Sequence, residues 1–198
     1  MRNIFNEIYS RDISKKIKSS LRLKGKSGGR LTSIPIYGYK LDPDNKNNWI
    51  VDGEAAESIR LIYKLAVQNK GPSAIARELQ DKNILTPAAY MAAAGFGRFK
   101  NASIADKYRW NAQSVKNILE MPEYMGHTVN FKTCKISYKT RAKLMTPRED
   151  WLVFEDTHGA IIDKDTWEAA QKSRRIKRRN RLTKAGKHDK IIYNNKNN

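Results

Sequence analysis

Apolar side chains recur mostly at every fourth position in the first stretch of the chain, residues 3–24, with basic residues between them. This spacing predicts a long amphipathic helix with one apolar edge, made of Ile4, Ile8, Ile13, Ile17 and Leu21. A glycine inside a helix costs about 1 kcal/mol relative to alanine. Gly25, Gly28 and Gly29 therefore predict the end of this helix, followed by an extended and mobile arm.

The pattern changes beyond the arm. Two strand-like stretches, residues 36–41 and 49–51, flank a turn sequence and predict a β-hairpin. Asp52 then stands where it can cap a helix whose apolar positions are spaced by threes and fours as far as Val67. Another helix is expected to begin at Pro72, because proline suits a first helical turn.

Residues 86–109 are rich in alanine and glycine and weakly patterned, so we expect a long loop, with a short helix within it as the alternative. A third helix follows, because Asn111 is a good N-cap and Trp110 and Val115 stand in the positions of a hydrophobic staple. Proline at position 122 predicts its end.

The last part of the chain predicts a small sheet and one more helix. Residues 124–132 and 150–154 are strand-like and are joined by a basic loop. Asp163 can cap a helix that is acidic early and basic late, as the helix dipole favours. The fold class expected is α+β and mainly helical, with a helix-turn-helix-like core, a small antiparallel sheet and the long amphipathic helix in front.

Charge narrows the possible partners. The chain has 198 residues, of which 39% are hydrophobic, and a formal net charge of +19. The hydrophobic content is enough for one ordinary core with flexible ends. The positive charge is concentrated in the first forty residues, in residues 132–148 and in residues 172–190. Such clusters favour a polyanionic partner, above all nucleic acid, over the alternative that the charge only aids solubility.

The sequence does not favour a membrane protein, a secreted protein or a metal-binding protein. No run of eighteen apolar residues and no secretion signal is present, which predicts a cytoplasmic or nucleoid-associated protein without membrane contact. Cys134 is alone, and His127, His158 and His188 lack the spacing of metal ligands. We therefore expect neither a metal nor another cofactor.

Three basic or polar stretches are candidates for nucleic-acid contact. Helices 72–82 and 111–120 are typical of a helix-turn-helix stretched by an insertion, and the second leaves polar side chains outside its apolar face. The small, cationic arm suits a minor groove, and the basic run near residues 174–181 suits phosphates. The alternatives are a solvated helix face, a flexible linker and a solvated helix end.

Six motifs resemble, in order, the DNA-binding "recombinase" domain of the large serine recombinases. They are Tyr9-Ser10-Arg11-Asp12-Ile13-Ser14-Lys15-Lys16-Ile17, Ile34-Pro35-Ile36-Tyr37-Gly38-Tyr39, Ala74-Ile75-Ala76-Arg77-Glu78-Leu79, Trp110 through Val115 to Ile118-Leu119, Pro122-Glu123-Tyr124-Met125-Gly126, and Ala160-Ile161-Ile162-Asp163-Lys164-Asp165-Thr166-Trp167. The resemblance implies site-specific DNA recombination, in phage integration or transposon resolution. It also implies a domain order: linker helix 1–24, Gly/Lys arm 25–33, DNA-binding domain 34–180 and flexible basic tail 181–198.

The resemblance also implies that catalysis belongs to a domain that this sequence lacks. The nucleophile motif of serine recombinases is Tyr-x-Arg-x-Ser, and here Tyr9 and Arg11 are followed by Ile13 where the serine belongs. The zinc ribbon that follows in the family, with its paired cysteines, has no counterpart in this sequence. We expect no strand cleavage by this chain alone.

The sequence thus predicts binding of double-stranded DNA at one half of a recombination site, with the catalytic domain as a further partner and a homodimer through the N-terminal helix as an option. The rivals are a non-catalytic DNA-binding regulator and an RNA-binding basic protein. The residues expected to contact DNA are Arg22, Lys24, Lys26, Arg30, Gln113, Ser114, Lys116, Asn117, Lys139, Arg141, Arg174, Arg175, Arg178 and Arg179.

Overall fold

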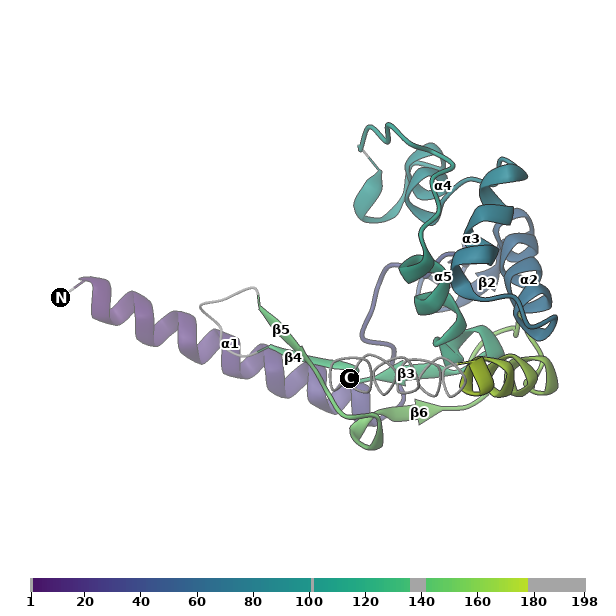
Figure 1. Ribbon diagram of the computed structural model, residues 1–198. Helices are drawn as coiled ribbons and strands as arrows, with labels where there is room; N and C mark the ends of the chain where they lie inside the picture. Colours follow the sequence, from purple (N-terminus) through teal and green to yellow (C-terminus); the bar gives the residue numbers. More distant parts are fainter. Residues whose placement is uncertain (1, 101, 136–141, 178–198) are drawn as a thin grey trace, which may run out of the picture. The chain divides into compact units, whose positions relative to one another are not determined.

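The computed structural model describes residues 2–100, 102–135 and 142–177 (Figure 1). The chain divides into two compact units. Unit 1 contains residues 1–35, 41–50 and 122–160, and unit 2 contains residues 36–40, 51–121 and 161–198. Neither unit is continuous in sequence, so each is assembled from segments that are distant along the chain.

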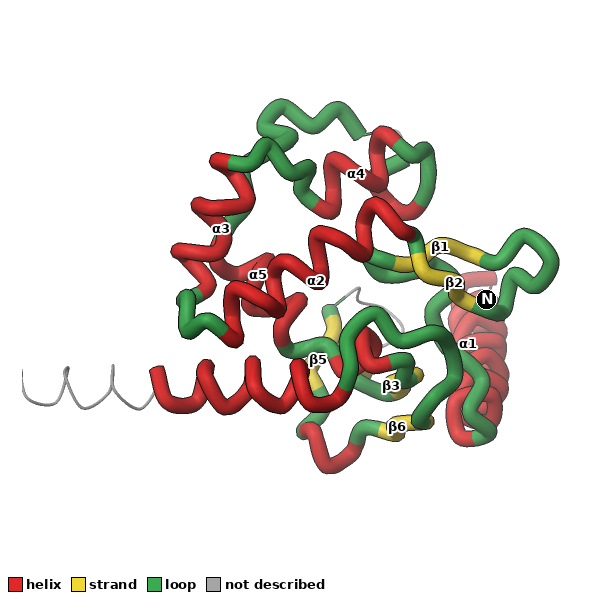
Figure 2. The backbone as a smooth tube through the Cα atoms, turned by 90° about the vertical axis from the view of Figure 1, so that its right-hand side faces the viewer, coloured by secondary structure: helices red, strands yellow, loops and turns green. Residues whose placement is uncertain are grey.

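Three helices form the centre of unit 2: α2 (Gly53–Val67), α3 (Pro72–Asp81) and α5 (Ala112–Leu119). They pack against one another, as Figure 2 shows. Each contributes the apolar face predicted from its spacing, so α3 and α5 meet as the helix-turn-helix pattern requires. The fully buried side chains at this centre are Ile59, Ile62, Tyr63, Ile75, Leu79, Val115 and Leu119.

Two of the three predicted side-chain caps are confirmed. The Asn111 Oδ1 accepts a hydrogen bond from the backbone N–H of Ser114 at 2.7 Å, and Asp163 Oδ1 accepts one from that of Thr166 at 2.8 Å, ahead of a helix at residues 164–177. Asp52 does occupy the N-cap position of α2, but its carboxylate makes no capping bond. It accepts a hydrogen bond from the Tyr90 hydroxyl at 2.8 Å instead, a neighbour that sequence spacing does not reveal.

The segment between α3 and α5 is more regular than a loop. It contains α4 (Pro87–Ala93) and the short 3₁₀ helix η1 (Gly97–Phe99). Its two ends are held together, because the N–H of Thr86 donates to the carbonyl oxygen of Lys107 at 2.9 Å. The buried Trp110 donates from Nε1 to the carbonyl oxygen of Ile84 at 2.9 Å, which ties the start of α5 to the end of α3.

In unit 1, α1 (Arg2–Lys26) is one continuous helix (Figure 1). It continues through Gly25, where the sequence predicted its end. Gly25 is buried, and a Cβ there would lie 2.5 Å from the Phe131 ring, so the missing side chain serves close packing. The helix ends instead at Lys26, and Gly28 follows with a φ of +85°, while the Gly29 N–H donates to the Lys24 carbonyl at 2.9 Å. This is the usual glycine-terminated helix end.

The strands are short and lie in two-stranded antiparallel pairs. The predicted hairpin is present as β1 (Tyr39–Leu41) and β2 (Trp49–Val51). Farther along, β3 (Thr128–Asn130) pairs with β6 (Leu152–Phe154), placing Val129 opposite Val153, and β4 (Thr133–Lys135) pairs with β5 (Lys143–Met145).

Two details of this sheet region correct the sequence prediction. The start of the expected strand 124–132 is the 3₁₀ helix η2 (Pro122–Met125), and the positive φ of Gly126, 88°, turns the chain before β3 begins. The expected basic loop contains the β4–β5 hairpin, and a further 3₁₀ helix, η3 (Arg148–Asp150), precedes β6. The α+β, mainly helical fold class is confirmed.

Candidate functional site

The polar face of α5 is fixed by what lies on its other side. Val115, Ile118 and Leu119 are buried in the core of unit 2, which leaves Gln113, Lys116 and Asn117 exposed. Hydrogen bonds from Gln171 and Arg174 to the Leu119 carbonyl hold the last turn. The helix is therefore anchored at both ends, by the Asn111 cap and by this contact, and its three exposed side chains share one face.

The two amides on this face are already paired. Gln113 Nε2 donates to Asn117 Oδ1 at 2.6 Å, one helical turn away. This bond leaves the Gln113 carbonyl and the Asn117 amino group directed elsewhere. Ser114 is only half exposed, and its backbone N–H is used by the Asn111 cap. The structure thus brings Gln113, Lys116 and Asn117 together and gives Ser114 a share in the helix start.

The arginines predicted to contact DNA at the end of the chain differ in their burial and in their partners. Arg174 binds Glu120 Oε1 at 2.6 Å and the Leu119 carbonyl at 3.4 Å, so its guanidinium joins this helix to the end of α5. Arg175 is exposed. Arg178 and Arg179 lie outside the described residues, as do Lys139 and Arg141 of the basic loop.

The arm predicted to be extended and mobile is instead held by hydrogen bonds within unit 1. The side chain of Asn130, which is 2% exposed, donates to the carbonyl oxygens of Gly25 at 3.1 Å and Gly29 at 3.0 Å. One amide thereby satisfies a carbonyl at the end of α1 and another in the arm. These hydrogen bonds offset the conformational entropy that the glycine backbone loses when it is held in one conformation.

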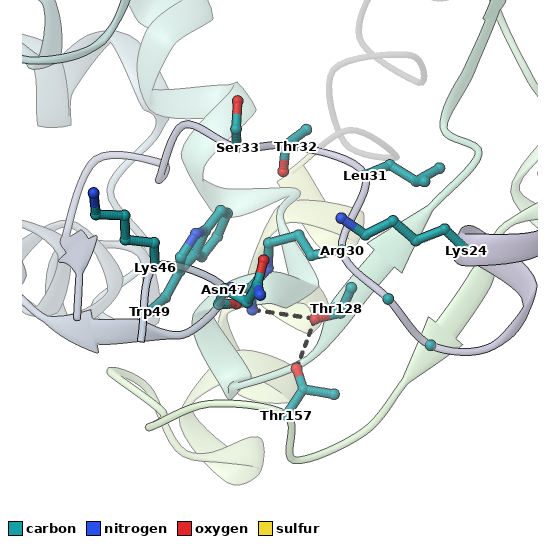
Figure 3. A pocket seen from close by; sticks show the side chains of 12 residues that line it. Lys24, Arg30, Leu31, Thr32, Ser33, Lys46, Asn47, Trp49, Thr128 and Thr157 are labelled. Atoms are coloured by element: carbon teal, nitrogen blue, oxygen red, sulfur yellow. Dashed lines mark hydrogen bonds between the residues drawn. The ribbon is translucent and has the colours of Figure 1, made fainter. Parts of the chain in front are cut away.

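Arg30 is half-buried beside this part of the arm. Its guanidinium carbon lies 3.8 Å from the centre of the Trp49 ring, close enough for a cation–π contact. Its nitrogens donate to Thr128 Oγ1 at 3.2 Å, to His158 Nδ1 at 3.0 Å and to the Asn47 carbonyl at 3.4 Å (Figure 3). These contacts fix the side chain, so Arg30 is a positioning residue of the arm.

His158 is held neutral beside Arg30. Its Nε2 lies 3.1 Å from the Glu123 carbonyl, which can only accept, so Nε2 carries the proton and Nδ1 accepts from Arg30. Burial, and then the charge of Arg30, lower the pKa of His158 to about 4. At neutral pH the imidazole of His158 is therefore uncharged, and the guanidinium of Arg30 carries the positive charge of this pair.

The other predicted residues of this region, Arg22, Lys24 and Lys26, are exposed on the last turns of α1. Lys24 lines a cavity of unit 1 together with Arg30 and with Lys46, which the sequence prediction passed over. Asn130 and His158 were also missed as organisers of the arm. An asparagine inside an apolar strand, next to Val129, was the one signal that could have marked Asn130.

Neither a metal-ion cluster nor a membrane-spanning helix occurs among the described residues. Among them, no group of three or more His, Cys, Asp or Glu side chains could hold a metal ion. No helix in the described ranges is long and apolar enough to cross a membrane. The hydroxyl of Ser14, next to the near-match to a nucleophile motif, donates to the Ser10 carbonyl within α1 at 2.8 Å.

A comparison with protein families decides the relationship of this chain. Residues 53–179 match the family model described as Recombinase, which is more than half of the sequence. The chain belongs to the recombinase family. This confirms the family predicted from the six motifs, and the match covers all of α2, α3 and α5.

Two solved structures are similar to this recombinase chain. One is described as a crystal structure of an LSR–DNA complex, with 16% identity and a TM-score of 0.45, covering 80% of this chain and 41% of that chain. The other comes from work on the sequence requirements of the Listeria innocua prophage attP site, with 19% identity and a TM-score of 0.39, covering 82% and 50%. The chain therefore spans half or less of the length of these two structures.

Proposed function

We propose that this recombinase chain binds double-stranded DNA at one half of a recombination site and reads sequence with α5. The observation that carries the proposal is the exposed face of α5, where Gln113, Lys116 and Asn117 stand on a helix whose opposite side is buried. A helix anchored in this way holds its exposed side chains in a fixed orientation. The net charge of +19 supplies attraction to phosphates that does not depend on sequence.

The chemistry of the three side chains assigns them different roles. Carboxamides can form paired hydrogen bonds with adenine in the major groove, so Gln113 and Asn117 are the proposed readers. Their mutual hydrogen bond holds both in the free protein and is exchanged for base contacts on binding. Lys116 carries a flexible charge that suits a phosphate, which positions the helix without specifying a base.

The remaining predicted contacts stay part of the proposal as phosphate binders. Arg22 and Lys26 are exposed on α1, and Arg175 is exposed on helix 164–177. Arg174 acts through Glu120 and α5 instead of through DNA directly. In this proposal, strand breakage requires the serine of a recombinase catalytic domain, because Ile13 replaces the serine in the only near-match of this sequence.

We also propose that α1 is covered by protein, either a second copy or the catalytic domain. Ile8, Ile13, Ile17 and Leu21 are between 38% and 54% exposed along this helix. Such a row of apolar side chains is typical of a helix that packs against another surface. Sedimentation of the purified chain at increasing concentration tests the homodimer, and Ile17→Lys should shift the equilibrium to monomer.

The test of sequence reading begins with selection of a preferred duplex from a random library at fixed salt. Replacing Gln113 or Asn117 by alanine should then cost about 1–3 kcal/mol on the selected duplex and little on random DNA. Lys116→Ala should weaken both about equally. Gln68→Ala, which removes an exposed amide after α2, is the matched control.

The outcome also separates the rivals. Equal losses on selected and random DNA for all three α5 variants would show that α5 does not read sequence. A preference for structured or single-stranded RNA over every duplex would favour the RNA-binding alternative. A non-catalytic regulator would bind the selected duplex normally but would gain no strand transfer when a recombinase catalytic domain is joined to the chain. Thermal melts of each variant confirm that the helix remains folded.

A further inference from the structure

Unit 1 contains a cavity of about 470 Å³ that the proposed reading helix does not use. It lies where the end of α1, the arm, the turn between β1 and β2, and β3 come together (Figure 3). The lining combines basic and hydroxyl side chains with the apolar surfaces of Leu31 and Trp49, and no carboxylate occurs among the described residues that form it. These residues are Lys24, Gly28, Gly29, Arg30, Leu31, Thr32, Ser33, Lys46, Asn47, Trp49, Thr128 and Thr157.

Two lysines stand at opposite sides of the cavity. Lys24 extends from α1, and Lys46 extends from the turn between β1 and β2, as Figure 3 shows. Both are exposed. Between them, the arm contributes the hydroxyl groups of Thr32 and Ser33, which are exposed as well. In Figure 3 the Lys24 ammonium points toward the arm, whereas the Lys46 ammonium and the Ser33 hydroxyl point away from Arg30. Ammonium and hydroxyl groups are donors for a tetrahedral oxyanion, and an exposed lysine side chain can change its rotamer to reach one.

The floor of the cavity adds a fixed cation. Arg30 is held against Trp49 and by its bonds to Thr128 and His158, so its charge stays in place without a ligand. The depressed pKa of His158 keeps the imidazole neutral at pH 7, which avoids a second buried charge beside the guanidinium. The two exposed lysines and the hydrogen-bonded arginine together give the cavity a positive potential.

The walls of the cavity are formed before any ligand arrives. The Asn130 amide holds the carbonyl oxygens of Gly25 and Gly29, and the Gly28 backbone closes the end of α1. Ordering a flexible backbone costs about 1–2 kcal/mol per residue, and this arm does not incur that cost on binding. An arm that is already ordered can hold the lining groups of a binding site in place for one ligand.

We propose that this cavity takes one phosphate of the DNA backbone with its adjoining sugar. On binding, the exposed side chains of Lys24 and Lys46 turn toward the phosphate and bind its non-bridging oxygens, and Thr32 donates to the same group. Arg30 positions the arm beneath it. The assignment rests on the proposed function, because two exposed lysines hold a small free anion weakly, whereas the rest of a DNA interface supplies a high local concentration of phosphate.

The test combines protein variants with DNA in which single phosphates of the selected duplex are modified. Each phosphate is replaced in turn by an uncharged methylphosphonate, and binding is measured for the wild type and for Lys24→Gln/Lys46→Gln. One position should lose about tenfold in affinity with the wild type and nothing further with the variant. The matched control, Lys64→Gln/Lys82→Gln, removes the same charge from exposed positions outside the cavity and should keep that loss.

The outcomes are distinguishable. If every methylphosphonate effect persists in Lys24→Gln/Lys46→Gln, the cavity holds no DNA phosphate, although the proposed function stands. If the wild type binds no duplex at all, the proposed function fails and this assignment fails with it. Titration with inorganic phosphate at constant ionic strength completes the test. Saturation below about 1 mM, abolished in the variant, would assign the cavity to a free anion and overturn the DNA assignment.

Discussion

Replacing Asn130 by alanine should destabilise unit 1 by removing a buried side chain that joins the end of α1 to the arm. Its Nδ2 donates to the Gly25 carbonyl at 3.1 Å and to the Gly29 carbonyl at 3.0 Å. A buried polar group left without its partner costs about 1–3 kcal/mol. Gly25 is buried, but Gly29 is half-buried and can recover water, so we expect the free energy of unfolding to fall by about 2–4 kcal/mol.

Urea denaturation followed by circular dichroism measures this change, and hydrogen exchange of the Gly29 amide, which is bonded to the Lys24 carbonyl, reports local opening. Asn6→Ala on the exposed surface of α1 is the matched control. Asn130→Asp keeps the shape of the side chain but cannot donate when ionised, so it should be at least as destabilising. A loss below about 0.5 kcal/mol for Asn130→Ala, or a clearly milder effect of Asn130→Asp, would refute the reasoning.

Three further predictions concern backbone strain and pH. Gly126→Ala should lower stability by about 1–3 kcal/mol more than Gly95→Ala. Both glycines have a positive φ, but of the two only Gly126 would place a Cβ 2.5 Å from a backbone oxygen. Thermal melts of the two variants measure the difference. The pKa of His158, lowered to about 4 by burial, predicts that stability falls as pH drops from about 6.5 towards 4, since only the unfolded state gains the proton; His158→Gln should flatten this slope. Burial, and then the bond to Asp52, raise the pKa of Tyr90, so stability should fall above about pH 10 by an amount that Tyr90→Phe reduces; a Tyr90→Phe profile identical to that of the wild type would contradict this.

The sequence by itself determined much of unit 2. The spacing of apolar residues predicted α2, α3 and α5 and the faces they bury, because a helix of 3.6 residues per turn places such positions on one side. The Asn111 and Asp163 caps were predictable for a similar reason, since each cap bonds to a backbone group only three residues away. Local rules were sufficient wherever the deciding partner is near in sequence.

Tertiary structure decided the arm and the cavity. Glycines in the arm predicted a mobile segment, but a residue about a hundred positions later in the chain, Asn130, binds the backbone at Gly25 and Gly29 and fixes it. Arg30 was predicted to contact DNA from its charge and position alone, and the structure places its guanidinium against Trp49 and His158. Propensity describes an isolated segment, and it cannot include the free energy gained when distant side chains satisfy that segment's polar groups.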